Sequence, residues 1–427
     1  MPAPSALERY VDQHRHRLVE IVQDLVRIPS ENTAPTGAEK ACQEYLARQL
    51  RALGWEPSLY ELRDVPGLAE HPLYWPGRDY TDRPNLGARR PGAGGGRSLL
   101  LTGHIDTVPR GTQPWTRDPF GGAVEGDRLY GRGSNDMKGG VATNLFVLEA
   151  LHELGIRLAG DLVFETVVDE EFGGVNGTLA GRLAGFNADA AIISEPSFLR
   201  ICPAQRGGRI AHIAFRSSGG ILDDAGSAPG VVDQLTRFLN RVPEFAAARR
   251  QKARVHPYYA NNPDPVPVTV AKIHTAPWGT GEPCTIPDTC RVEFYWQAMP
   301  GETQADIEAE FFAWLDSVSA LRPEVEFPLR WLPGSALSRN EPLISELAAS
   351  ATQALGAEPV IVGIEGPCDM YVFHQAFGIP AVLYGARGGN THSADEYLEI
   401  DTAVAAAKTL LLFVCRWCTC VFSDHLP

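Results

Sequence analysis

Short apolar runs along this chain alternate with stretches in which apolar residues recur at helical spacing. Helices are predicted over 6–28, 37–53 and 138–155, the second followed by Gly54 and the third closed by Gly155. Four runs have the length and apolar character of buried β-strands: 98–101, 162–168, 190–193 and 381–384. This alternation predicts an α/β fold built on a doubly wound, mostly parallel sheet.

Residues 61–97 interrupt the pattern, because they are rich in proline, glycine and arginine and show no hydrophobic period. Such a composition is typical of loops rather than of helices or strands. Long loops without secondary structure are uncommon inside a compact domain. We therefore expect a surface insertion that leads into the run at 98–101.

After Arg200 the hydrophobic pattern changes to that of a compact α+β unit. Strands are predicted over 209–216, 266–273, 291–297 and 325–329, and helices over 231–242 and 303–321. This order predicts a split βαβ, ferredoxin-like domain inserted into the α/β domain. We expect the first part of the α/β domain at 1–203, the insertion at 204–330 and the second part at 331–427.

Composition and charge narrow the classes of protein to consider. The chain has 427 residues, 44% of them hydrophobic and 21% charged, which favours two globular domains. The formal net charge of -14 argues against a nucleic-acid partner. No apolar run approaches the roughly 20 residues that span a bilayer, and no basic start precedes an apolar stretch. We expect a cytoplasmic protein without a membrane partner.

Eight cysteines are present, and their scatter fits reduced thiols rather than a disulfide framework. Cys415, Cys418 and Cys420 lie together near the end of an apolar helix. A soft metal site there would need a second ligand cluster, and the sequence shows none. Packing at a helix end is the favoured interpretation of these three thiols.

Five short stretches carry side chains that bind hard metal ions or exchange protons, and nearly every one follows a strand-like run. They contain seven candidate residues: His104, Asp106, Asp136, Glu170, Glu171, Glu195 and His392. Because strand ends meet at one rim of an open α/β sheet, we expect these side chains to converge there. Imidazole and carboxylate ligands suit zinc and related divalent ions. The set predicts a metal-dependent hydrolase with a small-molecule substrate.

The spacing within each stretch bears on the role of each residue. His104 and Asp106 share one face of an extended segment, so Asp106 can lie behind the imidazole or beside it. Glu170 and Glu171 are adjacent and cannot share a face, so one can bind metal while the other acts as general base. Asp136 lies among glycines that allow the backbone to approach bound metal ions closely, as a carboxylate that bridges two metals requires. An aspartate in such a turn is most often a helix N-cap.

With these motifs in this order, the chain resembles the di-zinc family of aminoacylase, acetylornithine deacetylase, succinyl-diaminopimelate desuccinylase and glutamate carboxypeptidase. The resemblance runs from the first helix to Asp395–Tyr397. It implies two metal sites with a shared aspartate: one of His104, Asp136 and Glu195, the other of Asp136, Glu171 and His392. Zinc is the expected metal, with cobalt or manganese as alternatives.

The same resemblance implies the roles of the remaining residues. Glu170 would be the general base that acts on a metal-bridging water, and Asp106 would support His104. The peptide after Asp136 is expected to be cis. The inserted domain would be a lid that also forms the interface of a homodimer.

In the inserted domain the chain departs from the family. The segment Ser217–Gly226 lacks the histidine that family members use to polarise the scissile carbonyl. Cys284 stands where the family has asparagine, while Gln297 and Tyr371 stand where it has arginine. Losing an arginine removes bidentate recognition of a carboxylate. We therefore expect a substrate other than an N-acyl amino acid held by its α-carboxylate.

Three histidines could replace the missing one: His212, His256 and His274. Each is more simply explained by surface or strand packing.

An aminopeptidase or dipeptidase is the nearest alternative function, because metal ligation barely distinguishes it from a deacylase. A specialised metal-binding protein with reduced catalysis is a second alternative. A nucleotide-binding enzyme is disfavoured, since the glycines at 131–140 form no phosphate-binding fingerprint.

Overall fold

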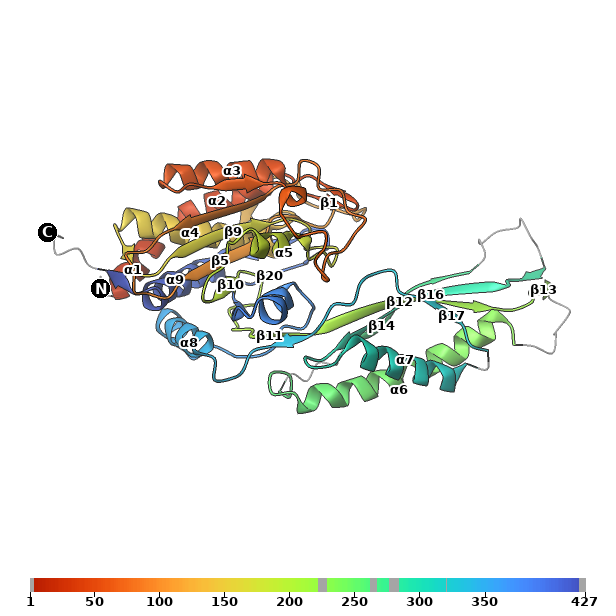
Figure 1. The fold of residues 1–427 in the computed structure, drawn as a ribbon. Coiled ribbons are helices and arrows are strands. Elements are labelled where there is room, and N and C mark those ends of the chain that lie inside the picture. The colour runs from red at the N-terminus through yellow and green to blue at the C-terminus, as the bar shows by residue number, and fades with distance from the viewer. Residues whose placement is uncertain (1–3, 222–228, 262–266, 276–283, 320, 422–427) are drawn as a thin grey trace. The chain divides into compact units, whose positions relative to one another are not determined.

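The computed structural model describes residues 4–221, 229–261, 267–275, 284–319 and 321–421. Contacts divide the chain into two compact units. The first unit comprises Met1–Pro203, Leu337–Val362 and Asp369–Pro427, and the second comprises Ala204–Ala336 and Gly363–Cys368. Each unit has its own sheet and is described by itself (Figure 1).

A six-stranded sheet forms the centre of the first unit. Its strands lie in the order β19 (Ala381–Leu383), β10 (Ala191–Ile193), β5 (Leu99–His104), β9 (Leu162–Val167), β4 (Asn85–Arg90) and β3 (Ser58–Tyr60). The first four are parallel, and β4 and β3 add an antiparallel edge. The four strands predicted from apolar runs are confirmed, and the first unit has a mixed α/β fold.

Burial on both faces explains why these four strands read as continuous apolar runs. Every residue of β5 and β9 is buried, as parallel strands covered on both faces require. Leu100 of β5 pairs with Ala191 of β10 and with Val163 of β9. Because the strands run in the same direction, their carboxyl ends meet at one edge of the sheet.

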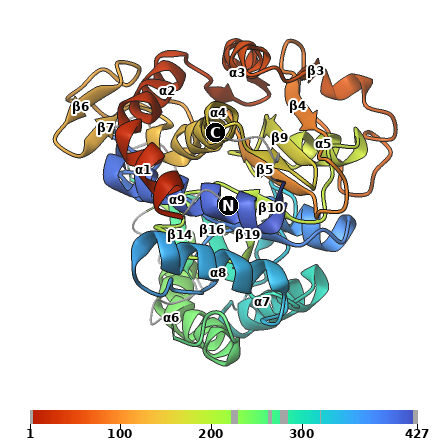
Figure 2. The ribbon, with the colours of Figure 1, turned by 90° about the vertical axis from the view of Figure 1, so that its left-hand side faces the viewer.

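Helices surround this sheet (Figure 2). They are α1 (Pro4–Gln13), α2 (Arg15–Arg27), α3 (Lys40–Ala52), α4 (Gly139–Glu153), α5 (Asn176–Leu183), α8 (Pro342–Leu355) and α9 (Ile400–Trp417). The single helix predicted over 6–28 is wrong, because the chain leaves helical geometry at His14 (φ −109°, ψ 17°). The helix predicted from residue 37 begins at Lys40, since Thr36–Gly37 pairs with Asn32–Thr33 in a short hairpin.

The prediction of a surface insertion over 61–97 is also wrong, because this segment supplies β4 to the central sheet. Only Leu86 and Ala88 are apolar within Asn85–Arg90, so the strand carries no recognisable apolar run. Gly87 lies against the ring of Phe186, which a Cβ would approach to 2.5 Å. Close packing of Phe186 on this glycine, together with the buried side chain of Leu86, places the strand in the core.

The second unit contains a four-stranded antiparallel sheet in the order β14 (Val268–His274), β16 (Thr289–Ala298), β12 (Gly207–Arg216) and β17 (Glu324–Glu326). Helix α6 (Val231–Val255) follows β12, and α7 (Gln304–Val318) follows β16. This chain order and strand order are those of a split βαβ unit. Its core is aromatic, with Trp296 and Phe311 stacked at a ring separation of 4.5 Å.

Helix α6 continues beyond its predicted end at Val242, although Pro243 lies inside it. Residues after the proline face the core: Phe245 is buried, and Arg249 donates to the carbonyl oxygen of Gln297 at 2.9 Å. These contacts offset the backbone hydrogen bond that proline cannot make. Tertiary packing therefore decides the length of this helix.

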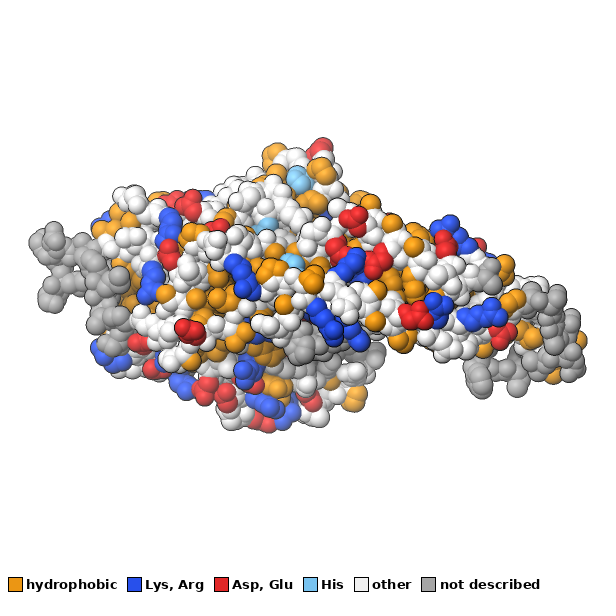
Figure 3. Space-filling model, turned by 90° about the horizontal axis from the view of Figure 1, so that it is seen from below, with side chains coloured by type: hydrophobic (Ala, Val, Ile, Leu, Met, Phe, Trp, Pro, Cys, Tyr) orange, Lys and Arg blue, Asp and Glu red, His pale blue; other side chains and the backbone are white. Residues whose placement is uncertain are grey.

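Acidic and basic side chains are interspersed on the face drawn in Figure 3. Within the described ranges, no helix is both long enough and apolar enough to cross a membrane.

We expect Phe245→Ala to lower the free energy of unfolding of the second unit by about 3–5 kcal/mol, because it empties a site in the aromatic core. Arg250→Ala is the matched control, since Arg250 is exposed on the same helix and should change stability by less than about 0.5 kcal/mol. Urea unfolding followed by tryptophan fluorescence measures both. Equal, small effects would show that the helix does not pack beyond Pro243.

Candidate metal centre

Two histidines and three carboxylates converge at the carboxyl edge of the central sheet. His104 is the last residue of β5, and its Nε2 lies 3.2 Å from Asp136 Oδ1 and 3.5 Å from Glu195 Oε1. On the other side of Asp136, His392 Nε2 lies 3.4 Å from Asp136 Oδ2 and 2.9 Å from Glu171 Oε2. The two oxygens of Asp136 thus face two separate histidine–glutamate pairs.

Different segments of the first unit supply these side chains. Glu170 and Glu171 follow β9, and Glu195 follows β10. Asp136 lies in the segment Ser134–Lys138 that precedes α4, where its own backbone is not helical (φ −118°, ψ 99°), and the expected cis peptide between Asp136 and Met137 is present. His392 lies between β20 (Gly388–Gly389) and β21 (Tyr397–Glu399).

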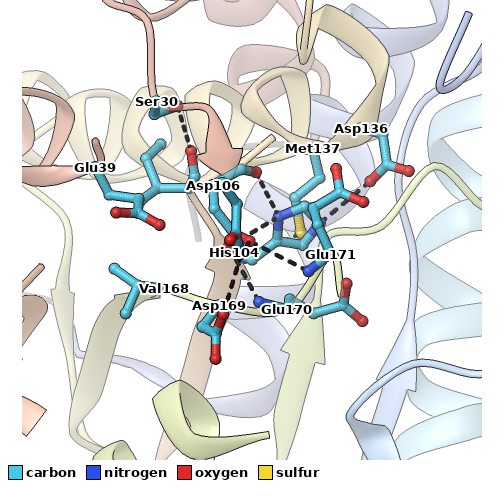
Figure 4. A network of polar contacts seen from close by, with 12 residues as sticks. Ser30, Glu39, His104, Asp106, Asp136, Met137, Val168, Asp169, Glu170 and Glu171 are labelled. Carbon is cyan, nitrogen blue, oxygen red and sulfur yellow. Dashed lines mark hydrogen bonds and ion pairs between the residues drawn. The ribbon is translucent and has the colours of Figure 1, made fainter. Parts of the chain in front are cut away.

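Glu170 lies beside the first of the two pairs. Ligand atoms of His104, Glu170 and Glu195 fall within 4.8 Å of one another, as do those of His104, Asp136 and Glu171. All seven residues predicted from the sequence are therefore brought into one region of the first unit. Figure 4 shows five of them: His104, Asp106, Asp136, Glu170 and Glu171.

Asp106 supports the site differently from the expectation. The backbone oxygen of Asp106, not its carboxylate, lies 2.9 Å from His104 Nδ1, and the nearest carboxylate oxygen is 3.6 Å away. The carboxylate instead accepts the backbone N–H groups of Glu170 and Glu171, each at 3.2 Å (Figure 4). Asp106 thus orients one imidazole and the glutamate turn together, as supporting groups of metal ligands commonly do.

A buried network extends this support beneath the glutamate turn. Asn32 Nδ2 donates to Asp106 Oδ2 at 2.9 Å and to Asp169 Oδ1 at 3.1 Å. Asp169 has a left-handed backbone conformation (φ 70°), which an aspartate rarely adopts. Its carboxylate accepts the hydroxyl of Tyr80 at 2.7 Å and pairs with the guanidinium of Arg78. These partners hold the unusual turn that presents Glu170.

The sequence pattern did not predict this network, because Arg78, Tyr80 and Arg83 belong to the segment expected to be a surface insertion. Arg83 is fully buried and pairs with Glu39 at 2.6 Å. Burial raises the pKa of Glu39 to about 7, although Arg83 opposes the shift. No local motif marks these residues, since their partners come from distant parts of the chain.

A second buried carboxylate, Glu396, holds the loop that carries Asp136. Its oxygens accept the backbone N–H groups of Gly133, Asn135 and Asp136, each at 3.0 Å, and pair with Arg132 at 2.5 Å. Arg132 also donates to the carbonyl oxygen of Ser393, the residue after His392. The Glu396–Arg132 pair therefore ties the Asp136 loop to the His392 loop.

The electrostatics of the centre are dominated by buried acids. Burial raises the pKa of Glu170 and of Glu195 well above the usual value for glutamate. Burial, together with the charge of Asp136, raises the pKa of Glu171 to about 7. Hydrogen bonds to Asp136 and Glu171 raise the pKa of His392 to about 11. In the absence of a cation, the cluster lowers its charge by retaining protons.

These features fit a pair of divalent cations. Carboxylates in close mutual contact repel one another strongly when they are buried, and bound cations remove that repulsion. The donor atoms are imidazole nitrogens and carboxylate oxygens, which zinc, cobalt and manganese accept. The two sets meet at Asp136, as expected for two ions with a shared ligand.

One acid at the centre was not identified as a site residue from the sequence. Asp369 is 6% exposed and shares a small pocket with Glu170, Glu195, Thr178 and Phe373. Its carboxylate accepts the hydroxyl of Thr178, and burial raises its pKa. A single aspartate in Gly-Pro-Cys-Asp-Met-Tyr follows no strand-like run, so the signal used for the other acids was missing here.

Most of the residues that differ from the family pattern make local contacts. Gln297 is buried, accepts from Arg206 at 3.1 Å and donates to the backbone of Glu365 at 2.7 Å. Tyr371 is buried, and Cys284 is exposed. Within Ser217–Gly226, residues 222–226 lie outside the described residues.

Local contacts also surround the candidate replacement histidines. His212 pairs with Glu293 across two strands at 3.1 Å, His256 packs against Tyr259, and His274 is exposed. The replacement of the family histidine by one of these three stays a prediction.

We expect Glu396→Gln to weaken metal binding by about 10–100-fold, because an amide cannot accept all four donors and leaves Arg132 without its counter-charge. Glu399→Gln on β21 is the matched control, since Glu399 lies 3.9 Å from Arg387 and its side chain pairs with no candidate metal ligand among the described residues. Metal content after dialysis against a graded chelator measures the effect. Unchanged retention of metal by Glu396→Gln would contradict the positioning role.

Metal binding should strengthen as the pH rises from 6 to 8. A raised pKa means that the metal-free protein holds the proton below that pKa, so a cation must displace it. His392, with a pKa of about 11, is protonated throughout this range, and Glu171, with a pKa of about 7, loses its proton within it. Calorimetry in two buffers at pH 7 should show release of about one proton or more per chain. Metal binding without proton release would contradict the assignment.

Comparison with known proteins places this centre in context. The profile of peptidase family M20/M25/M40 matches residues 100–416. The N-formyl-4-amino-5-aminomethyl-2-methylpyrimidine deformylase of Bacillus subtilis is 25% identical, over 97% of this chain and 97% of its own length. The succinyl-diaminopimelate desuccinylase of Methylobacterium radiotolerans is 28% identical, over 90% and 92%.

Solved structures share the fold. An M20-family metallo-carboxypeptidase from Sulfolobus solfataricus superimposes with a TM-score of 0.71 at 18% identity, covering 93% of this chain and 98% of its own. A dinuclear metal-binding peptidase of the same family from Bacillus subtilis has a TM-score of 0.58 at 17% identity, covering 95% and 99%. The match to the family profile covers most of the sequence. This chain therefore belongs to peptidase family M20/M25/M40, a family of metal-dependent hydrolases that cleave amide bonds.

Proposed function

We propose that this protein hydrolyses the amide bond of a small N-acylated amine that carries no α-carboxylate. The carrying observation is the acidic wall at the metal centre, where Asp369 lies beside Glu170 and Glu195. No lysine or arginine lines this small pocket among the described residues, although the guanidinium of Arg182 lies 4.7 Å from the ring centre of Phe373. Such a wall repels a carboxylate and accepts a neutral or cationic amine. The Bacillus relative supports this substrate class, since its name describes a formylated aminomethylpyrimidine.

His104, Asp136 and Glu195 hold one divalent ion in this proposal, and Asp136, Glu171 and His392 hold the other. Zinc is the proposed metal, because the ligands are imidazole and carboxylate. When bound, two such ions polarise the scissile carbonyl and make a water molecule more acidic.

Glu170 is the proposed general base. It has no cation paired with its carboxylate among the described residues, and its buried position raises its pKa above that of ordinary glutamate. A raised pKa allows the same carboxylate to take a proton from the attacking water and return it to the leaving amine. The backbone N–H of Glu170 is held by Asp106, which fixes where this proton transfer occurs.

Asp369 is the proposed substrate-binding acid, and its carboxylate accepts a hydrogen bond from Thr178. Phe373 in the same pocket is 1% exposed and lies 4.7 Å from the guanidinium of Arg182, so its ring is part of the core rather than a free surface. A cationic or hydrogen-bond-donating amine gains from the Asp369 carboxylate, whereas the carboxylate of an acyl amino acid does not.

Several finer features belong to this proposal. We propose that the first unit is doubly wound and that the second unit serves as a lid. We propose a homodimer formed through the second unit, supported by the mostly exposed edge strand β14. We propose a cytoplasmic location, supported by eight cysteines that are all free.

The second candidate function is that of an aminopeptidase or a dipeptidase. The solved structures reported above are peptidases, but at 17–18% identity they support the fold alone. The two functions differ in whether the pocket takes an acyl amine or a dipeptide.

We expect zinc- or cobalt-loaded protein to release free amine from N-formyl and N-acetyl arylmethylamines faster than it cleaves dipeptides or N-acyl amino acids. Mass spectrometry of a mixed substrate library measures the three classes together. Preferential cleavage of dipeptides would favour the second candidate, and preferential turnover of N-acetylornithine would overturn the proposed substrate class.

Glu170→Gln should lower kcat by about 10²–10⁴-fold while metal content stays unchanged, because an amide cannot accept the proton. Glu358→Gln, an exposed substitution in the same unit, is the matched control and should retain full activity. Full activity of Glu170→Gln would exclude Glu170 as the base.

A further inference from the structure

A second cavity lies in the first unit, at the edge of the sheet opposite the metal centre. Its volume is about 350 Å³, and its wall includes Leu162, the first residue of β9. The other end of β9 leads to Glu170, so the strand separates the two sites. The cavity also contacts the last turn of α4 and the short strand β8 (Arg157–Leu158).

The inner wall of this cavity is apolar. It is formed by the indole of Trp55 and by leucine side chains, among them Leu148, Leu151 and Leu158. Trp55 is 5% exposed, and its Nε1 has no hydrogen-bond partner among the described residues.

The charged groups of the wall all have the same sign. Among the described residues its ionisable side chains are Arg90, His152 and Arg157, each exposed. No described acidic side chain lines the cavity, although Asp161 accepts the backbone N–H of Gly92 in the wall at 2.9 Å and pairs with Arg89. In the described part of the chain, neither Arg90 nor Arg157 forms an ion pair; Arg90 donates only to the carbonyl oxygen of Leu53 and lies 5.9 Å from the ring of Trp55. The side chains that line this cavity are therefore basic, whereas the whole chain has a net charge of -14.

The carboxyl end of α4 does not cancel this positive field. Its last carbonyl groups accept backbone N–H groups from residues 154–156, namely Leu154 to Ala150, Gly155 to His152 and Ile156 to Leu151. Carbonyl groups capped in this way present little free negative charge to the cavity. The guanidinium groups therefore determine which charge is attracted.

We propose that this cavity is a second binding site, for a small amphipathic anion with a flat apolar body and a carboxylate. The body would lie against Trp55 and the leucines, and the carboxylate would pair with Arg90 and Arg157, whose planar donors match its geometry. The volume is at the lower end of the range of roughly 300–1,000 Å³ found for small-molecule pockets. The site is independent of the proposed hydrolysis.

The probe for the test is 2-naphthoate, titrated into metal-loaded protein by calorimetry, with neutral 2-naphthalenemethanol as the matched ligand. We expect one naphthoate to bind per chain, and the alcohol to bind at least about tenfold more weakly because it lacks the charge. Equal affinity for the two ligands, or no binding of naphthoate at millimolar concentration, would overturn the proposal.

Variants locate the bound probe. The double variant Arg90→Gln/Arg157→Gln should weaken naphthoate binding by at least about tenfold, whereas Arg250→Gln, an exposed change in the other unit, should not. Glu170→Gln should bind naphthoate like the unsubstituted protein, since the metal centre lies at the other end of β9. Binding that survives the double variant, or is lost in Glu170→Gln, would place the probe elsewhere and refute the site.

Leu151→Trp provides a second, steric test, because a larger side chain fills the cavity without changing its charge. Circular dichroism and thermal unfolding establish that each variant is folded. A folded Leu151→Trp protein that binds naphthoate with unchanged affinity would also refute the site.

Discussion

Mutual repulsion of buried carboxylates is the physical constraint on which the first unit depends. Asp136, Glu171 and Glu195 have side chains at most 16% exposed and contact His104 or His392, while Glu170 is partly buried and His392 is 49% exposed. Such a cluster is unfavourable by itself, because each ionised carboxylate raises the free energy needed to ionise its neighbour. Rigid partners around the cluster restrain it, and a bound cation would remove the remaining repulsion.

Most of those rigid partners are themselves charged and buried. Asp169 with Arg78, Glu39 with Arg83, and Glu396 with Arg132 each form a compact pair away from solvent. A buried pair contributes little net stability, but it specifies one geometry, since removing either partner leaves an uncompensated charge. Through Asn32 and Asp106, two of these pairs connect to the turn that presents Glu170. The third holds the two loops that bring Asp136 and His392 together. The catalytic proposal and the scaffold therefore rest on the same hydrogen bonds.

The second unit is stabilised in a different way from the first. Its stability comes from an aromatic core between one antiparallel sheet and two helices, with polar side chains such as Gln297 used in local hydrogen bonds. Gln297 has replaced the arginine expected from the resemblance, and both polar ends of its side chain are engaged within the unit. This fits the pocket of the first unit, where Asp369 adds negative charge and no arginine is present among the described wall residues. Both observations favour a substrate that lacks a carboxylate.

The sequence by itself identified the residues that converge at the candidate metal centre and the four parallel strands of the sheet. Buried parallel strands are continuous apolar runs, and side chains such as His104, Glu171 and Glu195 follow them directly, so local pattern and chemistry coincide. Tertiary structure alone decided the role of residues 78–90, because β4 is short and glycine-containing and the partners of Arg78 and Arg83 lie far away in the chain. It also decided the length of α6 and the placement of Asp369, neither of which has a local signal. Strands and helices that depend on the spacing of hydrophobic residues can be predicted from the sequence. Interactions of buried charged side chains cannot, because their partners are distant in the sequence and are brought close only by the fold.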